Sequence, residues 1–571
     1  MNPFDWIVLL GTMVGIAAYG TWRTRHTDNL NTYLKGNRNT GWLTIGLSVM
    51  ATQASTITYL SLPGQAYENG IAFIQNYFGL PLALIIVCAV FLPIYRRLGV
   101  YTAYEYLGKR FDAKTRLLGA AIFLLQRGLQ AGITIYAPAI ILSTVLGWQL
   151  HLTIIFTGLL VIVYTVTGGS AAVNLTQKLQ MAVIFGGMIT AFCVLLWKLP
   201  AHAVPIAGVM GKLQAVDFSP DLKQRYTFWS GLLGGLFLSL SYFGTDQSQV
   251  QRYIGGAALR EGRLGLMFNA VFKIPMQFFI VMVGALLFVF YQSQPGTPVF
   301  FNQTEWQHQV AGPQGARLRA IEEKYAVAHA GQQGKIRAWV DARERGNAAE
   351  ESAARSALGV AQKAANAVRQ EARDTLKAID PAAPTKDSDY VFITFILTQL
   401  PHGVIGLLIA VMFASALSSK AGELNALGTT STIDLWRHFR PLAAHDEARN
   451  VRNAKWFTAL WGLFAIGFAL FVSSAENLIE GLNIVASIFY PALLGVFVVA
   501  FFLKWIGGGA VFYAALAAQV LVLGLFALGK VYPAHEIGYL WLNPIGVAAC
   551  VLFSMLLQLV MGGTSKAHTA G

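Results

Sequence analysis

Long apolar runs constrain this chain more than any other feature of its sequence. Runs of eighteen or more apolar residues recur along the 571 residues, and each is long enough to cross a bilayer as a helix. Only 12% of the residues are charged, about half the share in a soluble domain. A transmembrane β-barrel would instead show ~10-residue segments of alternating polarity. The sequence therefore predicts an all-α polytopic membrane protein embedded in a lipid bilayer.

The apolar runs predict about thirteen transmembrane helices. Alternate short loops carry the Lys and Arg residues, and the positive-inside rule places these loops in the cytoplasm. The net charge of +14 is therefore assigned to the inner membrane surface, and no nucleic-acid partner is expected. An odd number of spans gives an outer N-terminus and a cytoplasmic C-terminus in the plasma (inner) membrane. The predicted spans are 4–22, 42–66, 75–95, 117–145, 150–167, 178–198, 227–249, 264–291, 391–419, 455–473, 480–503, 509–528 and 541–561.

The order of these spans suggests two five-helix repeats of opposite orientation. We expect an extra helix and inner loop at 1–40, a first repeat at 41–200, a second repeat at 226–505, and two further helices with a tail at 506–571.

Residues 292–389 interrupt the second repeat. This insertion is polar and rich in Ala, Gln, Glu, Arg and Lys. Long loops cross the membrane largely regardless of their charge, so we place it on the outer side. Its stretches 316–329 and 348–379 are predicted to be helical. It is either a solvated hairpin without chemistry of its own or a docking surface for an outer partner.

Two predicted spans have polar interruptions at matching places in the two halves. Residues 48–59 place hydroxyls and one amide in the second span, and residues 231–244 place glycines, serines and a tyrosine in the seventh. Polar groups in lipid are costly unless they face a cavity or another helix. Interrupted helices that begin two inverted halves indicate a central binding site, where carbonyls can ligate a cation and helix ends can face a solute.

A second group of hydroxyls lies far along the chain. Ser415, Ser418 and Ser419 are spaced i, i+3 and i+4, which places them on one helix face. With carbonyls from the interrupted second span, they would form an all-oxygen shell suited to Na⁺. Serines in membrane helices can also serve close packing or bond to their own backbone, and the spacing alone leaves that alternative open.

Three strings of residues, in order, resemble the sodium/solute symporter family, which includes sodium/glucose, sialic acid, iodide and monocarboxylate transporters. YTAYEYLGKRF at 101–111 is similar to the family's EYL…RF loop. GGSAAVNLTQKLQ at 168–180 is similar to its GG…AV…TD…Q stretch, and DQSQVQRY at 246–253 to its NQ…QR ending of a broken helix. The resemblance runs from span two to span eleven. It implies a LeuT-type 5+5 inverted-repeat fold and solute uptake coupled to Na⁺.

The same resemblance implies a sodium site. Gln177 stands where relatives with a second sodium site carry an acidic residue, so one Na⁺ per cycle is expected. Lys420 lies beside the serines but points away from their helix face, and a snorkelling or packing role is expected for it. The implied ligands are carbonyls of Ala51, Ala54 and Ser415 and hydroxyls of Ser418 and Ser419.

The remaining polar residues inside the spans are candidates for contacts with the solute. Lys273 is the most unusual, because an isolated lysine in an apolar run should pair, lose its proton or snorkel. Resemblance to the sugar-transporting branch places Gln53, Ser239, Lys273 and Asn483 on or near sugar-contacting positions, and Tyr242 on an inner gate. The predicted solute-binding residues are Gln53, Ser55, Thr56, Asn76, Ser239, Tyr242, Lys273 and Asn483.

The amides, hydroxyls and aromatics of this set favour a sugar or sugar derivative. Residues 61–67 and 249–253 look closer to the monocarboxylate, vitamin and iodide branch, so a small organic anion is the alternative. An enzyme is not expected, because protease, nucleophile-elbow and phosphate-loop motifs are missing from the sequence. Glu423, Asp434 and Asp246 are expected to hold loops through caps or ion pairs. A receptor or channel remains a further alternative.

Overall fold

The computed structural model describes residues 1–23, 41–53, 55–100, 102–254, 258–381, 383–440, 447–471 and 477–562, and for 17–23, 167–179 and 447–448 the backbone alone. Within these ranges every regular element is helical. Nine helices there are long and apolar enough to cross a membrane, and three shorter ones are apolar as well. Their outer faces expose large apolar side chains such as Val271 and Phe471. An all-α polytopic membrane protein is confirmed, while the count of thirteen spans stays a prediction.

The helices before residue 210 include the first predicted interruption. Helix α3 ends at Gln53 and α4 begins at Thr56, with Ser55 extended between them. The residues that flank α9 both contact the insertion, through Gln149 with His308 and His202 with Glu344. The elements are α1 (Pro3–Arg23), α3 (Trp42–Gln53), α4 (Thr56–Asn69), η1 (Gly70–Tyr77), α5 (Leu80–Ile86), η2 (Val87–Phe91), α6 (Leu92–Leu98), α7 (Ala103–Arg110), α8 (Ala113–Leu146), α9 (Leu150–Lys198) and α10 (Ala203–Val209).

The second interruption separates α11 from α12. Asp246 lies between them, and its carboxylate accepts the backbone N–H of Ser248 at 2.8 Å, as a helix cap does. Up to the insertion the elements are η3 (Ser230–Gly234), α11 (Gly235–Gly244), α12 (Gln247–Ile254) and α13 (Leu259–Ser293). After it follow η4 (Ser388–Tyr390), α17 (Val391–Gln399), α18 (Val404–Thr430), η5 (Ser431–Trp436), α19 (Arg437–Phe439), α20 (Glu447–Phe471), α21 (Leu478–Phe502), α22 (Gly508–Val531), η7 (Pro533–His535), η8 (Tyr539–Trp541) and α23 (Leu542–Met561).

One predicted span, 391–419, is wrong. The chain leaves the helix at Leu400, and α18 begins only at Val404. Pro401 disfavours a helical residue before it, and Gly403 has a φ of 87°, which a residue with a side chain rarely adopts. The serines of the expected cation site therefore lie in the middle of α18 rather than at the end of a span.

Close backbone contact brings the second interrupted helix against η1, the element that follows the first interrupted helix. A Cβ at Gly231 would lie 2.0 Å from the carbonyl oxygen of Gln75, and one at Gly235 would lie 2.6 Å from that of Asn76. Only glycine allows η3 and α11 to approach η1 this closely. The side chains that follow on η1 and α11 can therefore face one shared space.

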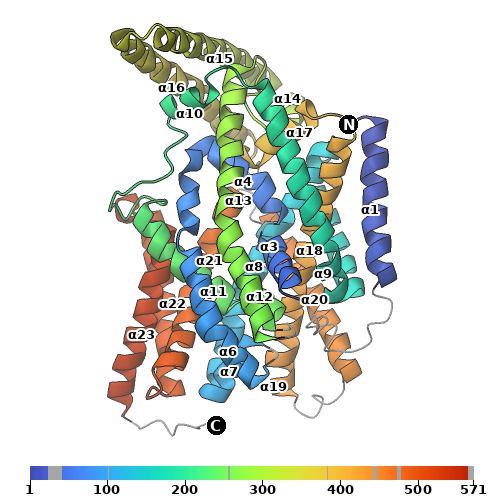
Figure 1. Cartoon of the computed structure of the whole chain (residues 1–571), viewed down its shortest axis with the longest axis vertical. Helices are drawn as coiled ribbons and strands as arrows, with labels where there is room; N and C mark the ends of the chain where they lie inside the picture. Colours follow the sequence, from blue (N-terminus) through green and yellow to red (C-terminus); the bar gives the residue numbers. More distant parts are fainter. Residues whose placement is uncertain are drawn as a thin grey trace.

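Helices α14 (Gln303–Val310), α15 (Gly315–Glu344) and α16 (Ala348–Ile379) form the insertion at one end of the bundle (Figure 1). Arg369 pairs with Asp387 at 2.9 Å, and Arg373 pairs with Glu68 at the end of α4 at 2.8 Å. The predicted helices at 316–329 and 348–379 are confirmed. Helix α1 begins at this end of the bundle and α23 ends at the other (Figure 1). The proposed domain bounds and the outer position stay predictions.

Candidate functional site

A central cavity of about 140 Å³ lies where the two interrupted helices meet. Residues of α3, η1, α8, α11, α13, α18 and α21 line it. The structure thus brings together side chains more than four hundred positions apart in the sequence. The predicted solute-binding residues on its wall are Gln53, Ser55, Asn76, Ser239, Tyr242, Lys273 and Asn483.

Thr56 is the predicted solute contact that does not line this cavity. Its hydroxyl is buried and donates to the backbone carbonyl of Met412. This bond ties the first turn of α4 to α18. A direct contact between Thr56 and a solute stays a prediction.

Three amide atoms of lining residues are buried without a hydrogen-bond partner. They are Oε1 of Gln53, Oδ1 of Asn76 and Nδ2 of Asn483. Buried polar atoms are nearly always satisfied by protein, water or ligand. These atoms are therefore free to donate to or accept from a polar solute in the cavity.

Lys273 places a positive charge on the wall of the cavity. Its side chain, on α13, is only 1% exposed, and Nζ lies 5.7 Å from the ring centroid of Tyr77. In the described part of the chain no residue accepts a hydrogen bond from it. A buried ammonium without an anion is destabilising. Its attraction to the face of an aromatic ring compensates only part of the hydration free energy that it loses on burial.

Four other buried charges next to the cavity neutralise one another. Arg127 pairs with Asp246, and its Nη1 lies 3.6 Å from Oε1 of Glu423. Lys420 donates to Oε2 of Glu423 at 2.7 Å. Tyr490 donates to Asp246 as well. We call Arg127, Asp246, Lys420 and Glu423 the charge network; its two cations and two anions leave Lys273 as the unbalanced charge of the cavity.

The charge network corrects two expectations. Lys420 neither snorkels nor merely packs, because it is 2% exposed and pairs with Glu423 one turn along α18. Asp246 caps α12 as expected and also pairs with Arg127, whereas Glu423 forms its ion pairs inside α18 and across to α8 rather than in a loop. Asp434 matches its expected role, with Arg116 at 2.7 Å. Sequence reasoning missed Arg127, although ionisable residues of both signs inside predicted spans were a usable signal.

The predicted sodium ligands converge next to the cavity. The hydroxyl of Ser419 lies 3.4 Å from the carbonyl oxygen of Ala51, which joins α18 to α3. The hydroxyl of Ser418 lies 3.1 Å from the carbonyl oxygen of Ser415 and 2.8 Å from Oε1 of Gln180. Ala54 lies outside the described residues.

Around Ser418 and Ser419, the carbonyl oxygens that accept hydrogen bonds outnumber the hydroxyl groups that donate to them. Two serine hydroxyls supply two protons, while Ala51, Ser415 and Gln180 each offer a carbonyl oxygen. Carbonyl and hydroxyl oxygens are the ligands that hard cations prefer. Gln180 was not among the predicted ligands, although it is the last residue of the TQKLQ string at 176–180. The side chain of Gln177 lies outside the described residues, so one Na⁺ per cycle stays a prediction.

Comparison with known proteins places these features in a family. The profile of the sodium:solute symporter family matches residues 33–302 and 374–517. The human sodium/iodide cotransporter is 33% identical over 284 residues, covering 49% of this chain and 43% of the relative. The human sodium-coupled monocarboxylate transporter 1 is 32% identical over 277 residues, covering 47% and 45%. The rabbit (Oryctolagus cuniculus) sodium-dependent multivitamin transporter is 30% identical over 298 residues, covering 51% and 46%. The matched region thus spans less than half the length of these relatives.

A solved structure agrees with the fold over nearly the whole chain. The substrate-bound, outward-open state of a Na⁺-coupled sialic acid symporter superposes with a TM-score of 0.73, at 20% identity and 99% coverage of both chains. The predicted LeuT-type fold is therefore confirmed. The family profile does not match residues 303–373, which form most of the insertion. It does match the helices that carry the cavity and the expected sodium site, on both sides of the insertion. The chain belongs to the sodium:solute symporter family.

Proposed function

We propose that this chain is a sodium-coupled symporter that imports a small organic anion with further polar groups. The observation that carries this proposal is Lys273, a buried cation on the cavity wall beside a charge network that is already neutral. A bound carboxylate would supply the missing counter-charge. The unpartnered amide atoms of Gln53, Asn76 and Asn483 would hold its hydroxyl, carbonyl or amide groups.

The names of the relatives support an anion over a neutral sugar. Iodide, monocarboxylates and sialic acid all appear in the names of similar proteins, and all are anions at neutral pH. A neutral sugar, which the residue types alone favoured, would use the amides but leave Lys273 without a counter-ion. A sugar acid satisfies both observations and belongs to the proposed class.

The mechanism we infer is alternating access with one Na⁺. The ion binds where Ala51 of α3 faces Ser418 and Ser419 of α18, and it holds these two helices together. The end of α3 also carries Gln53, which faces the solute, so a bound ion fixes one wall of the cavity. Transport of one Na⁺ with a monoanion moves no net charge across the membrane. Transport of one Na⁺ with a neutral sugar moves one positive charge, and the membrane potential then supplies about 2.3 kcal/mol per 100 mV.

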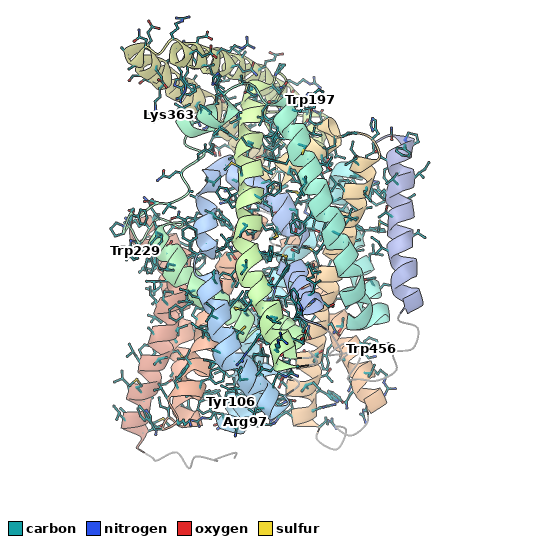
Figure 2. All side chains as sticks on the ribbon, viewed as in Figure 1. Arg97, Tyr106, Trp197, Trp229, Lys363 and Trp456 are labelled. Carbon is teal, nitrogen blue, oxygen red and sulfur yellow. The ribbon has the colours of Figure 1, made fainter. Side chains whose placement is uncertain are left out.

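We also infer the orientation in the membrane. Arg97 and the neighbouring Tyr106 lie at the end opposite the insertion, whereas Trp197 and Lys363 lie toward the insertion (Figure 2). The short loops rich in Lys and Arg belong to the Arg97 end, which the positive-inside rule assigns to the cytoplasm. The insertion then faces outward.

Uptake into proteoliposomes tests the proposal. Labelled monocarboxylates, sugar acids and neutral sugars are offered with and without an inward Na⁺ gradient, at zero potential and at an imposed potential. We expect Na⁺-dependent uptake of an acid that an imposed potential does not change. Na⁺-dependent uptake of neutral sugars alone would refute the anion, and uptake indifferent to Na⁺ would refute the coupling.

A further inference from the structure

One arginine lies between the helices that form the cation site. Arg252 is on α12, where its Nε donates to the carbonyl of Ser248 at 3.1 Å and its Nη1 donates to the hydroxyl of Ser48 on α3 at 2.7 Å. On the third side it lies against Gly422 of α18, where a Cβ would be 2.5 Å from Nη2. A single guanidinium therefore fills the junction of α3, α12 and α18.

This guanidinium lies one helical turn from the predicted sodium ligands. Ser48 precedes Ala51 by three residues in α3, and Gly422 follows Ser419 by three residues in α18. Three residues correspond to about 5 Å along a helix. Both steps lead away from the insertion, because α3 begins and α18 ends on the side of the bundle opposite to it (Figure 1). An ion that leaves between α3 and α18 toward that side meets Arg252.

A fixed positive charge at this place slows the passage of a cation. For an ion that passes the guanidinium at about 8 Å, with an effective dielectric constant of about 20, the repulsion is equivalent to roughly thirtyfold in the rate of passage. The effect acts on an ion that moves between the serines and the inner side, because this ion must pass the guanidinium. An ion from the outer side reaches the serines first.

We infer that Arg252 is the inner electrostatic barrier of the sodium path, and this inference rests on the proposed sodium symport. While Arg252 lies between α3 and α18, its charge blocks exit and re-entry of Na⁺ between these helices. When the two helices part, the guanidinium moves with α12 and the ion leaves. The barrier allows Na⁺ to bind from outside and hinders its return from the cytoplasm.

The experiment compares variants that change the charge with variants that change only the hydrogen bond. Purified protein is reconstituted, and ²²Na⁺ uptake and solute-driven exchange are measured with Na⁺ varied on each face in turn. Arg252→Gln should raise the rate of ²²Na⁺ entry and exit through the inner face by roughly thirtyfold and allow Na⁺ flux without solute. The rate at which Na⁺ from the outer face reaches the site should change by less than about threefold, since ions from that side do not pass the guanidinium.

Three controls separate charge from structure. Arg252→Lys keeps the charge and should behave like the unaltered protein, and Ser48→Ala should leave the rate of Na⁺ passage through the inner face within about twofold. Arg263→Gln removes another arginine, which bonds to the carbonyl of Cys88 instead, and it should have no effect. If Ser48→Ala reproduces Arg252→Gln, or if Arg252→Gln folds and leaves the inner-face rate unchanged, the inference fails. Sodium dependence of the unaltered protein tests the proposed function separately.

Discussion

Replacing Lys273 by methionine distinguishes an anionic solute from a neutral one. Methionine keeps the length of the side chain and removes its charge at a position that is 1% exposed. Loss of one partner from a buried charge pair costs about 3 kcal/mol, which is roughly 150-fold in affinity. Loss of a hydrogen bond to a neutral hydroxyl costs about 1 kcal/mol, which is roughly fivefold. We therefore expect a drop near 150-fold for the transported acid.

The assay is competition for Na⁺-driven uptake, which reports the apparent affinity of each solute. Lys273→Arg keeps the charge and should retain much of the affinity for the acid. Lys363→Met makes the same substitution on the exposed surface of α16, far from the cavity, and should have no effect (Figure 2). A drop of fivefold or less with Lys273→Met, in protein that remains folded, would refute the role of this ammonium as the counter-ion.

Three further predictions concern the proposed ion site and the end of the bundle that carries the insertion. Ser418→Ala combined with Ser419→Ala should abolish Na⁺-dependent uptake in folded protein; uptake that keeps its Na⁺ dependence would show that the ion site is misplaced. Burial raises the pKa of Asp389 to about 7, so the folded protein keeps a proton that the unfolded chain has lost. Its free energy of unfolding should therefore fall as pH rises from about 4 to about 7, and thermal denaturation of Asp389→Asn should lack this slope. Arg373→Gln, which leaves two carboxylates short of a partner, should lower stability by about 1–2 kcal/mol, while Arg343→Gln at an exposed pair should change it little.

Local patterns predicted those parts of the molecule that depend on residues near one another in sequence. Apolar runs predicted the helices, and the i, i+3, i+4 spacing of Ser415, Ser418 and Ser419 predicted one oxygen-rich face of α18. The break before α18 was missed, because the apolar composition continues through Pro401 and Gly403. Membership of the sodium:solute symporter family also supports the expectation of a transporter rather than an enzyme.

The charge network could not be predicted in the same way. Arg127 and Asp246 are 119 positions apart, and Arg127 lies in an apolar run that gives no indication of its partner. Only the packing of α8 and α12 against α18 brings the four charges together. A count of ionisable residues inside spans would have shown that Arg127, Lys420 and Lys273 all need anions. It would not have shown which cation the protein leaves unpaired.

The two sites share helices in a way that makes their coupling a consequence of geometry. Ala51 belongs to the proposed ion site and Gln53 lines the cavity from the same last turn of α3. On α18, Ser419 belongs to the proposed ion site, and Glu423, one turn later, lines the cavity and holds Arg127. A cation that draws α3 toward α18 therefore moves one residue of each cavity wall. Because coupling between two binding sites is reciprocal, a solute that fixes those walls must raise the affinity for Na⁺ by the same factor. Coupled transport then needs no long-range pathway, since the proposed ion site and the cavity are separated by no more than about one helix turn on α3 and on α18.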